Sequence, residues 1–348
     1  MAVITILGAG MMGSALALPL VDNGHEVRLV GTHLDGAIIE RLRATGEHPG
    51  LKCALPPGVV AYGHDELATA LGGAEAVALG VNSRGVDWAI EQLAPHAGAG
   101  WPVFLITKGL AERGDRLITF PAQVAAALGV EAAAVAGPCI AGELARRATT
   151  CVVLAGSHRP TLDRLAGLLR GPYYHVFPSL DVVGVEACAA LKNAYAMGIA
   201  FALGEHERAG GAPGSVALHN QESACFAQAV LEMGLIAAAL GGDGRSASGL
   251  PGVGDLDVTT NGGRTGRFGR LLGLGLPVAE AIERMEGATL ECLDILATLR
   301  RALPAYAARG ALDLAALPLL AHMQAVALDG APVAVPFARF FGGERDAG

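Results

Sequence analysis

Hydrophobic and polar positions alternate differently in the two halves of the chain. From residue 1 to about residue 180, short apolar runs are separated by amphipathic stretches, and the runs span residues 2–7, 26–30, 75–81, 101–107, 131–136 and 149–155. Alternation of this kind is typical of a mostly parallel β-sheet covered by helices. The first half is therefore predicted to be an α/β domain.

The second half lacks such runs. From about Asp181 onward, long segments rich in alanine and leucine take over, at residues 182–204, 215–240, 278–284, 288–309 and 312–328. Segments of this length and composition predict an all-helical region. Because neither a repeat nor a low-complexity linker separates the halves, the helix beginning near Val182 should join them directly. We expect two domains, residues 1–181 and residues 182–342.

Composition narrows the class of protein. Apolar residues make up 52% of the 348 residues and charged residues 17%, which excludes a disordered chain. The net charge is −8 and there is no basic run, so neither nucleic acid nor an anionic membrane surface is an expected partner. The chain also has no stretch of 18 uncharged apolar residues, and we expect no membrane span.

Cysteine and histidine spacing bears on the compartment and on metal binding. The chain starts with MAVITILG, which is typical of a strand and lacks the features of a secretion signal. The six cysteines include no CxxC pair, and the ten histidines form no HxxH or HxxxH motif. We therefore expect a cytoplasmic protein with reduced thiols and no metal site.

A glycine motif follows the first predicted strand. Gly8, Gly10 and Gly13 form GxGxxG between the strand VITIL and a segment with helical spacing. In this context the glycines allow a tight turn, the approach of backbone to a pyrophosphate, and close helix packing. The pattern predicts a bound dinucleotide, NAD or NADP.

The end of the second predicted strand bears on which dinucleotide is used. An acid that binds the ribose 2′-hydroxyl is expected there, but the chain has Val30, Gly31, Thr32 and His33. Thr32 and His33 could donate to a 2′-phosphate, so we expect NADP to be accepted at least as well as NAD. A solvated turn is an equally good interpretation of these two residues.

Polar residues also follow two later strands, where ligands of open α/β sheets gather. Asn82 comes after AVALGV, and Lys108 with Gly109 after VFLIT. Both positions favour a contact with a ligand, although a solvated loop charge would explain Lys108 equally well.

One charged residue interrupts an apolar helix. In ACAALKNAYAMGIAFALG, Lys192 is the single ionisable cation, with Asn193 beside it. A buried ammonium must reach the surface, pair with an acid or lose its proton. Its place at the predicted domain junction favours acid/base catalysis, and the glycine-rich segment that carries Asp255 and Asp257 offers a counter-ion.

The motifs, in their order along the chain, resemble those of the NAD(P)-dependent glycerol-3-phosphate dehydrogenases. They are GAGMMG, ITKGL, GPCIAGELA, ALKNAYA, GLPGVGDLDVTTNGGRTGRFG and Met285-Glu286-Gly287. The resemblance runs from residue 2 to about residue 290. It implies an N-terminal Rossmann-type dinucleotide-binding domain, a helical substrate domain, and interconversion of dihydroxyacetone phosphate and sn-glycerol 3-phosphate for phospholipid synthesis.

The resemblance also implies roles for single residues. Lys192 is similar to the family's catalytic lysine and Asp255 to its paired acid. The implied substrate-binding residues are Lys108, Asn193, Thr259, Arg264 and Thr265. With the motif analysis above, the expected cofactor-binding residues are Gly8, Gly10, Met11, Met12, Gly13, Thr32, His33, Asn82, Lys108, Ala141, Arg264 and Glu286. A homodimer is expected from the family alone.

Three positions depart from the family pattern: Thr265 replaces an asparagine, Cys139 a serine or asparagine, and Gln228 an arginine. These departures would permit a related NAD(P)-dependent reductase of another small 2-keto or 2-hydroxy compound. A non-catalytic dinucleotide-binding sensor is a separate alternative, and the retention of both Lys192 and Asp255 argues against it.

Overall fold

The computed structural model describes residues 1–213, 215 and 218–343. The chain folds into two compact units. The first comprises Met1–Ala111 and Ile118–Val182, and the second comprises Glu112–Leu117 and Val183–Gly348. A six-residue piece of the first half therefore belongs with the helical half, which the sequence pattern did not indicate.

The first unit is built on an eight-stranded sheet with the order β12-β11-β10-β7-β6-β1-β2-β5. Its strands are β1 (Val3–Leu7), β2 (Glu26–Val30), β5 (Val59–Tyr62), β6 (Ala76–Leu79), β7 (Val103–Leu105), β10 (Ala132–Ala136), β11 (Thr150–Gly156) and β12 (Tyr174–Ser179). Neighbouring strands are parallel except for β10 and β11. The predicted mostly parallel sheet is confirmed, and every predicted apolar run overlaps one strand. The edge strands β5 and β12 were not predicted.

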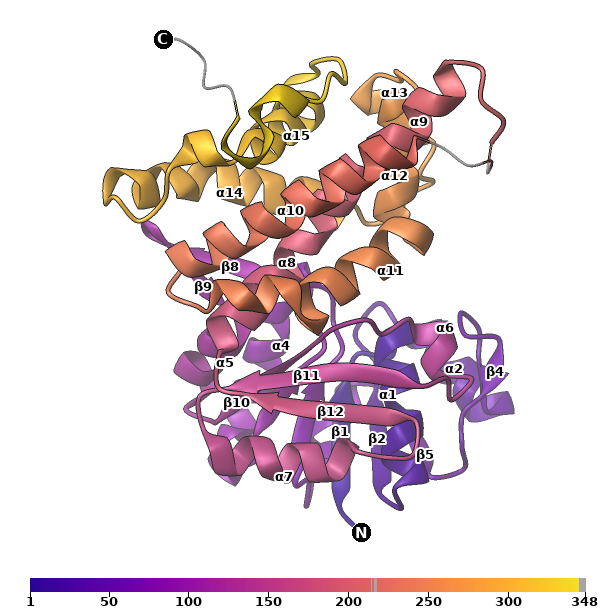
Figure 1. Cartoon of the computed structure of the whole chain (residues 1–348). Helices are drawn as coiled ribbons and strands as arrows, with labels where there is room; N and C mark the ends of the chain where they lie inside the picture. Colours follow the sequence, from indigo (N-terminus) through magenta and orange to yellow (C-terminus); the bar gives the residue numbers. More distant parts are fainter. Residues whose placement is uncertain (214, 216–217, 344–348) are drawn as a thin grey trace. The chain divides into compact units, whose positions relative to one another are not determined.

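Helices cover both faces of this sheet, because alternate side chains of each strand are buried on opposite sides. Ile4 and Ile6 of β1 join one core cluster, and Leu7 joins the other. The first cluster includes residues of α1 (Met11–Asp22), α2 (Gly36–Thr45) and α7 (Arg159–Leu169). The second includes residues of α3 (Leu67–Leu71), α4 (Val86–Leu93) and α5 (Phe120–Leu128). Figure 1 shows α7 beside β12.

The second unit is helical. Its helices are α8 (Val182–Ile199), α9 (Phe201–Arg208), α10 (His219–Ala239), α11 (Asp255–Gly262), α12 (Arg264–Gly273), α13 (Val278–Glu283), α14 (Glu291–Ala308) and α15 (Pro318–Asp329). In the described part of the chain beyond Ser179 there is no strand, so the predicted all-helical half is confirmed. The glycine-rich segment that forms α11 and α12 was not predicted to be helical.

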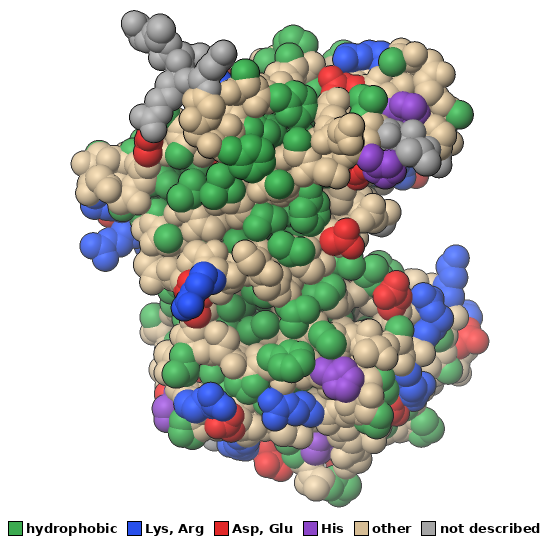
Figure 2. Space-filling view, viewed as in Figure 1, with side chains coloured by type: hydrophobic (Ala, Val, Ile, Leu, Met, Phe, Trp, Pro, Cys, Tyr) green, Lys and Arg blue, Asp and Glu red, His purple; other side chains and the backbone are tan. Residues whose placement is uncertain are grey.

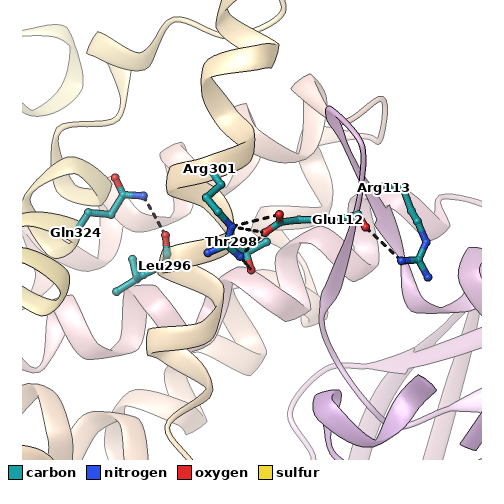
Figure 3. A network of polar contacts seen from close by, with 6 residues as sticks. All are labelled: Glu112, Arg113, Leu296, Thr298, Arg301 and Gln324. Carbon is teal, nitrogen blue, oxygen red and sulfur yellow. Dashed lines mark hydrogen bonds and ion pairs between the residues drawn. The ribbon is translucent and has the colours of Figure 1, made fainter. Parts of the chain in front are cut away.

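A hairpin from the first half is attached to this unit. It consists of β8 (Leu110–Arg113) and β9 (Arg116–Thr119). Arg301 of α14 donates to Glu112 from Nε at 3.0 Å and from Nη2 at 2.5 Å (Figure 3). The Leu117 N–H donates to the Tyr306 hydroxyl at 2.9 Å. These contacts explain why residues 112–117 belong to the second unit.

Two helical segments are long and apolar enough to cross a membrane by length and composition: Val182–Arg208 and His219–Ala239. The first is mostly buried in the protein, as expected of a core helix. Figure 2 shows hydrophobic side chains on the surface of the second unit, where Leu231, Phe337 and Phe341 are among the exposed residues. The expected absence of a membrane span stays a prediction.

Candidate functional site

The predicted glycine motif forms the connection between β1 and α1. Gly8 has φ +116°, and a Cβ there would lie 2.7 Å from the carbonyl carbon of Gly80. A Cβ on Gly13 would lie 2.2 Å from the Gly8 oxygen. A Cβ on Gly10 would meet nothing within 4 Å. Close backbone packing therefore requires glycine at positions 8 and 13. Gly10 leaves open space at the N-terminus of α1, which suits the pyrophosphate of a dinucleotide.

The first helical turn beside this space has no side-chain cap. Gly10 is the N-cap of α1, followed by Met11, which is exposed, and Met12, which is half-buried. The first N–H groups of an α-helix have no intrahelical partners and carry a partial positive charge. The residues present therefore fit an anionic group of the cofactor.

The end of β2 requires a correction to the sequence analysis, which placed no carboxylate there. Asp35, the residue before α2, turns back so that Oδ2 accepts from Thr32 N at 2.8 Å, Thr32 Oγ1 at 2.9 Å and Ala9 N at 3.2 Å. The acid was overlooked because it lies beyond the strand in sequence. His33 is exposed and packs edge-on against Trp88, with ring centroids 5.4 Å apart.

Three further predicted residues lie at the carboxyl ends of strands in the first unit. Asn82 follows β6 and accepts from the Gly85 N–H at 3.0 Å, capping a short 3₁₀ turn. Lys108 follows β7, and its Nζ donates to the Gly137 carbonyl at 3.4 Å. Ala141 begins the short helix α6 (Ala141–Leu144) after β10. All three therefore lie at the edge of the sheet where α/β proteins bind ligands.

In the second unit, the Lys192 ammonium donates to Oδ1 of Asp255. Lys192 is 9% exposed and Asp255 is 1% exposed. Removing both charges from water is costly, and only a well-aligned pair offsets that cost. The predicted lysine and its predicted counter-ion are therefore brought together, and the alternative of a solvated lysine is wrong.

The backbone around Asp255 explains its position. A π-helical turn, Leu250–Gly254, immediately precedes α11, and such turns are frequent at functional sites. A Cβ on Gly252 would lie 1.9 Å from the Ala247 oxygen, so this close approach requires glycine. The turn delivers Asp255 to the start of α11, facing the lysine of α8.

The remaining predicted residues of this segment follow along α11 and into α12. Thr259 donates from Oγ1 to the Asp255 carbonyl at 2.6 Å. A Cβ on Gly263 would lie 2.7 Å from the Thr259 oxygen, so the junction of the two helices is tightly packed. Arg264, the first residue of α12, is exposed, whereas Thr265 is buried. Contacts therefore link Lys192 to Asp255, Asp255 to Thr259, and Thr259 to Gly263, the residue before Arg264.

Asn193 and Glu286 occupy separate positions in this unit. Asn193 Nδ2 donates to Oε2 of Glu291 at 3.0 Å. Glu286 is exposed and adopts φ +53°, a conformation that is uncommon for residues other than glycine and that clusters at functional sites.

A second buried acid, Glu232 of α10, was not predicted from the sequence. Its carboxylate accepts from Tyr195 Oη at 2.9 Å, Gln228 Nε2 at 2.8 Å, and the N–H groups of Leu319 and Leu320 at 2.8 and 2.9 Å. Burial raises the pKa of Glu232, and these hydrogen bonds oppose the rise. Gln228 also accepts from the Phe341 N–H at 3.0 Å, so this departure from the family pattern belongs to a structural network.

A metal site would need several nitrogen, sulfur or oxygen ligands close together. In residues 1–213, 215 and 218–343, no group of three His, Cys, Asp or Glu residues is arranged to hold a metal ion.

Comparison with known proteins covers nearly the whole chain. Residues 3–161 match the family model of the NAD-dependent glycerol-3-phosphate dehydrogenase N-terminus, and residues 181–335 match that of the C-terminus. The NADP(+)-dependent glycerol-3-phosphate dehydrogenase of Archaeoglobus fulgidus is 37% identical over 82% of this chain and 84% of its own. The glycerol-3-phosphate dehydrogenase [NAD(P)+] of Shouchella clausii is 30% identical over 81% of each.

A solved structure agrees with these matches. The crystal structure of glycerol-3-phosphate dehydrogenase from Coxiella burnetii has a TM-score of 0.79 and 30% identity, with 95% of each chain covered. The structure from Plasmodium falciparum has a TM-score of 0.83 at 16% identity and supports the fold alone. The chain belongs to the NAD-dependent glycerol-3-phosphate dehydrogenase family.

Proposed function

We propose that this chain reduces dihydroxyacetone phosphate to sn-glycerol 3-phosphate with NADPH or NADH, and catalyses the reverse reaction. The observation that carries the proposal is the buried pair of Lys192 and Asp255, within a chain of this family. A buried charge pair between α8 and α11 is costly to retain, and buried titratable pairs of this kind cluster at sites of acid/base chemistry.

The bound nicotinamide cofactor supplies the hydride for this reduction. As negative charge grows on the substrate carbonyl oxygen, the Lys192 ammonium stabilises it and donates a proton to it. Asp255 holds Nζ in place and balances its charge, while the Thr259 hydroxyl ties the Asp255 carbonyl within α11. In the reverse direction, Lys192 accepts the proton from the substrate hydroxyl.

Basic and hydroxyl side chains serve the substrate phosphate. Arg264 binds the phosphate through charge-assisted hydrogen bonds and also contacts the cofactor. Thr265 supplies a hydroxyl where the family has an amide, and Lys108 and Asn193 complete the substrate-binding set. Binding the remote phosphate positions the carbonyl for reaction.

The cofactor is assigned to the domain of residues 1–181, and the substrate and its chemistry to residues 182–342. Gly8, Gly10, Met11, Met12 and Gly13 bind the pyrophosphate. Further contacts are assigned to Thr32, His33, Asn82, Lys108, Ala141 and Glu286. We favour NADP, since His33 is exposed and its ring can donate to a 2′-phosphate, and the relative from Archaeoglobus fulgidus is named as NADP(+)-dependent.

The test is turnover of dihydroxyacetone phosphate and unphosphorylated dihydroxyacetone by the purified protein, followed through the absorbance of NADPH and NADH. Arg264→Ala should raise KM for the phosphorylated substrate by about 10- to 100-fold, the effect of one charge-assisted bond, and change turnover of the other little. Arg267→Ala is the matched control, because Arg267 is an exposed arginine of the same helix that donates to the Arg284 carbonyl.

The same assay decides between the alternatives. Reduction of an unphosphorylated keto compound, with Arg264→Ala harmless, would identify a reductase of another substrate. Nucleotide binding without turnover of any keto compound would identify a sensor.

We also propose that the protein acts in the cytoplasm, supplies glycerol phosphate for phospholipid synthesis and forms a homodimer. The exposed hydrophobic side chains of the second unit support association. Sedimentation at several concentrations measures the mass, and a monomer throughout would refute the dimer.

A further inference from the structure

The middle residue of the GxG turn, Ala9, is held through both of its polar backbone groups. Its N–H donates to Oδ2 of Asp35 at 3.2 Å. Its carbonyl accepts from the Ser14 hydroxyl at 3.1 Å and is hydrogen-bonded to Nε2 of His48 at 2.9 Å. Asp35 and His48 lie 26 and 39 residues after Ala9 in the sequence, so their bonds to Ala9 are tertiary contacts of the turn.

The hydrogen bonds of the His48 ring determine which of its two nitrogens carries the proton. Its Nδ1 accepts from the N–H groups of Gly50 at 3.1 Å and Leu51 at 3.0 Å. Because a backbone N–H can only donate, Nδ1 carries no proton, and Nε2–H is left to donate to Ala9. The imidazole is 1% exposed, which fixes its orientation.

The segment that carries His48 also packs against the start of α1. His48 lies in β3 (Glu47–His48), which pairs with β4 (Cys53–Ala54). In the turn between them, a Cβ on Gly50 would lie 3.0 Å from Cγ of Met11, the first residue of α1. The turn therefore touches the phosphate-binding end of the helix as well as the glycine loop.

We infer that His48 and Asp35 are positioning residues that clamp Ala9 and so hold the glycine loop ready for the pyrophosphate. The inference rests on the proposed cofactor site. Gly8 and Gly10 flank Ala9, and glycine is the residue with the most conformational freedom to lose on binding. The bonds to the Ala9 N–H and to the Ala9 carbonyl fix the two peptide groups between these glycines. The loop therefore loses less conformational entropy when the dinucleotide binds. Asp35 then serves the loop through Oδ2, rather than acting as the ribose-binding acid.

The test measures dissociation constants of NADPH and NADH by titration, without turnover. His48→Leu should raise both by about tenfold, the effect of one lost buried hydrogen bond, while kcat at saturating cofactor changes little. His48→Gln should restore binding to within about threefold of the native protein, because its amide can donate in place of Nε2. Ser14→Ala removes the other donor to the same carbonyl and provides a second route should His48→Leu fail to fold.

His25→Leu is the matched control. His25 Nδ1 accepts from the Ala2 N–H at 3.2 Å, so it too is a histidine bonded to the backbone of this unit, but at the start of β1. Its loss should lower the melting temperature and leave both dissociation constants unchanged. Equal weakening of binding in His25→Leu and His48→Leu, or native affinity in folded His48→Leu, would overturn the clamp.

Asp35→Ala separates the clamp from a role in ribose recognition. The clamp predicts equal weakening of NADH and NADPH. Weakening of NADH alone would show that the carboxylate binds the ribose 2′-hydroxyl and would overturn its assignment to the loop. If the native protein binds nucleotide but does not reduce dihydroxyacetone phosphate, the proposed reaction is wrong. The ratio of each variant's dissociation constant to that of the native protein still tests the clamp.

Discussion

Two carboxylates of the second unit are buried to the same degree and held in opposite ways. Asp255 is 1% exposed and pairs with the Lys192 ammonium. Glu232 is 0% exposed and accepts only neutral donors in its four hydrogen bonds from Tyr195, Gln228, Leu319 and Leu320. Burial alone therefore does not distinguish these two acids, because they differ in the charge of the groups that bind them.

Both carboxylates bind side chains of the same helix, α8. Lys192 and Tyr195 are three residues apart and so lie on one face, about one turn from each other. Asp255 binds the ammonium of Lys192, the proton donor that we propose. Glu232 joins α8 to α10 and caps the first turn of α15, whose N–H groups favour a negative charge. The first arrangement suits proton transfer, and the second suits a scaffold.

The largest effect that the comparison predicts is on turnover in Lys192→Ala. Removing the proton donor should lower kcat by ~10² or more while cofactor affinity persists. Steady-state kinetics and nucleotide titration measure the two quantities. Tyr195→Phe is the control on the same helix and should keep kcat within about twofold. Native turnover in Lys192→Ala would refute the catalytic role.

Asp255→Asn should have a smaller effect on kcat, about tenfold to 100-fold. The amide can still accept the hydrogen bond from Lys192, but it no longer balances the charge. Asp257→Asn is the matched control, since Asp257 is an exposed acid of the same helix that accepts from Asn261 at 3.1 Å. If Asp255→Asn lowers only the unfolding free energy and turnover is native, Asp255 is a structural residue like Glu232.

The sequence predicted the parts of the fold that depend on local pattern. Central strands such as β6 and β10 are continuous apolar runs because both faces are covered. The edge strand β12 contains Pro178, which an interior strand excludes, and His175 is exposed, so its apolar pattern is weaker. The helices α11 and α12 contain glycines, which propensity disfavours, but tight backbone packing requires them there.

Some residues of the candidate site could be predicted from the local sequence, and others could not. Gly8 and Lys192 were found because a motif or a lone charge marks them in the sequence. Asp35, His48 and Glu232 were not, because their significance depends on partners distant in sequence that only the fold brings near. A buried acid on an amphipathic helix gives no local signal that distinguishes a cap for another helix from a solvated side chain.

Glu232→Ala should affect stability rather than chemistry. It leaves four donors without their acceptor, and two of them are N–H groups at the start of α15. We expect the free energy of unfolding to fall by roughly 2–4 kcal/mol, with kcat of the folded variant within about twofold of native. Urea unfolding and steady-state kinetics test this. A loss of kcat like that of Lys192→Ala, with native stability, would place Glu232 in the catalytic machinery.

The smallest predicted effect is the dependence of stability on pH through Glu232. Burial raises the pKa of its carboxyl above the ordinary value of 4.5, so the folded protein holds this proton more tightly than the unfolded chain. Below that value both states are protonated. As the pH rises through it, the unfolded chain releases the proton first, and the stability contributed by the group is lost until the folded carboxyl also ionises. The loss is about 1.4 kcal/mol for each unit by which the two pKa values differ.

Glu232→Gln removes this titration, so the stability of the native protein relative to the variant should decline in thermal or urea unfolding as the pH rises above the ordinary pKa of 4.5. Asp22→Asn tests the sign. The hydrogen bond from Arg147 lowers the pKa of Asp22, so its contribution is present above the ordinary pKa and is lost as the pH falls. The native protein should therefore gain stability over Asp22→Asn as the pH rises. Differences of the same sign for both variants would mean that the hydrogen bonds to Glu232 outweigh its burial, and that the pKa of Glu232 in the fold lies below that of an exposed acid.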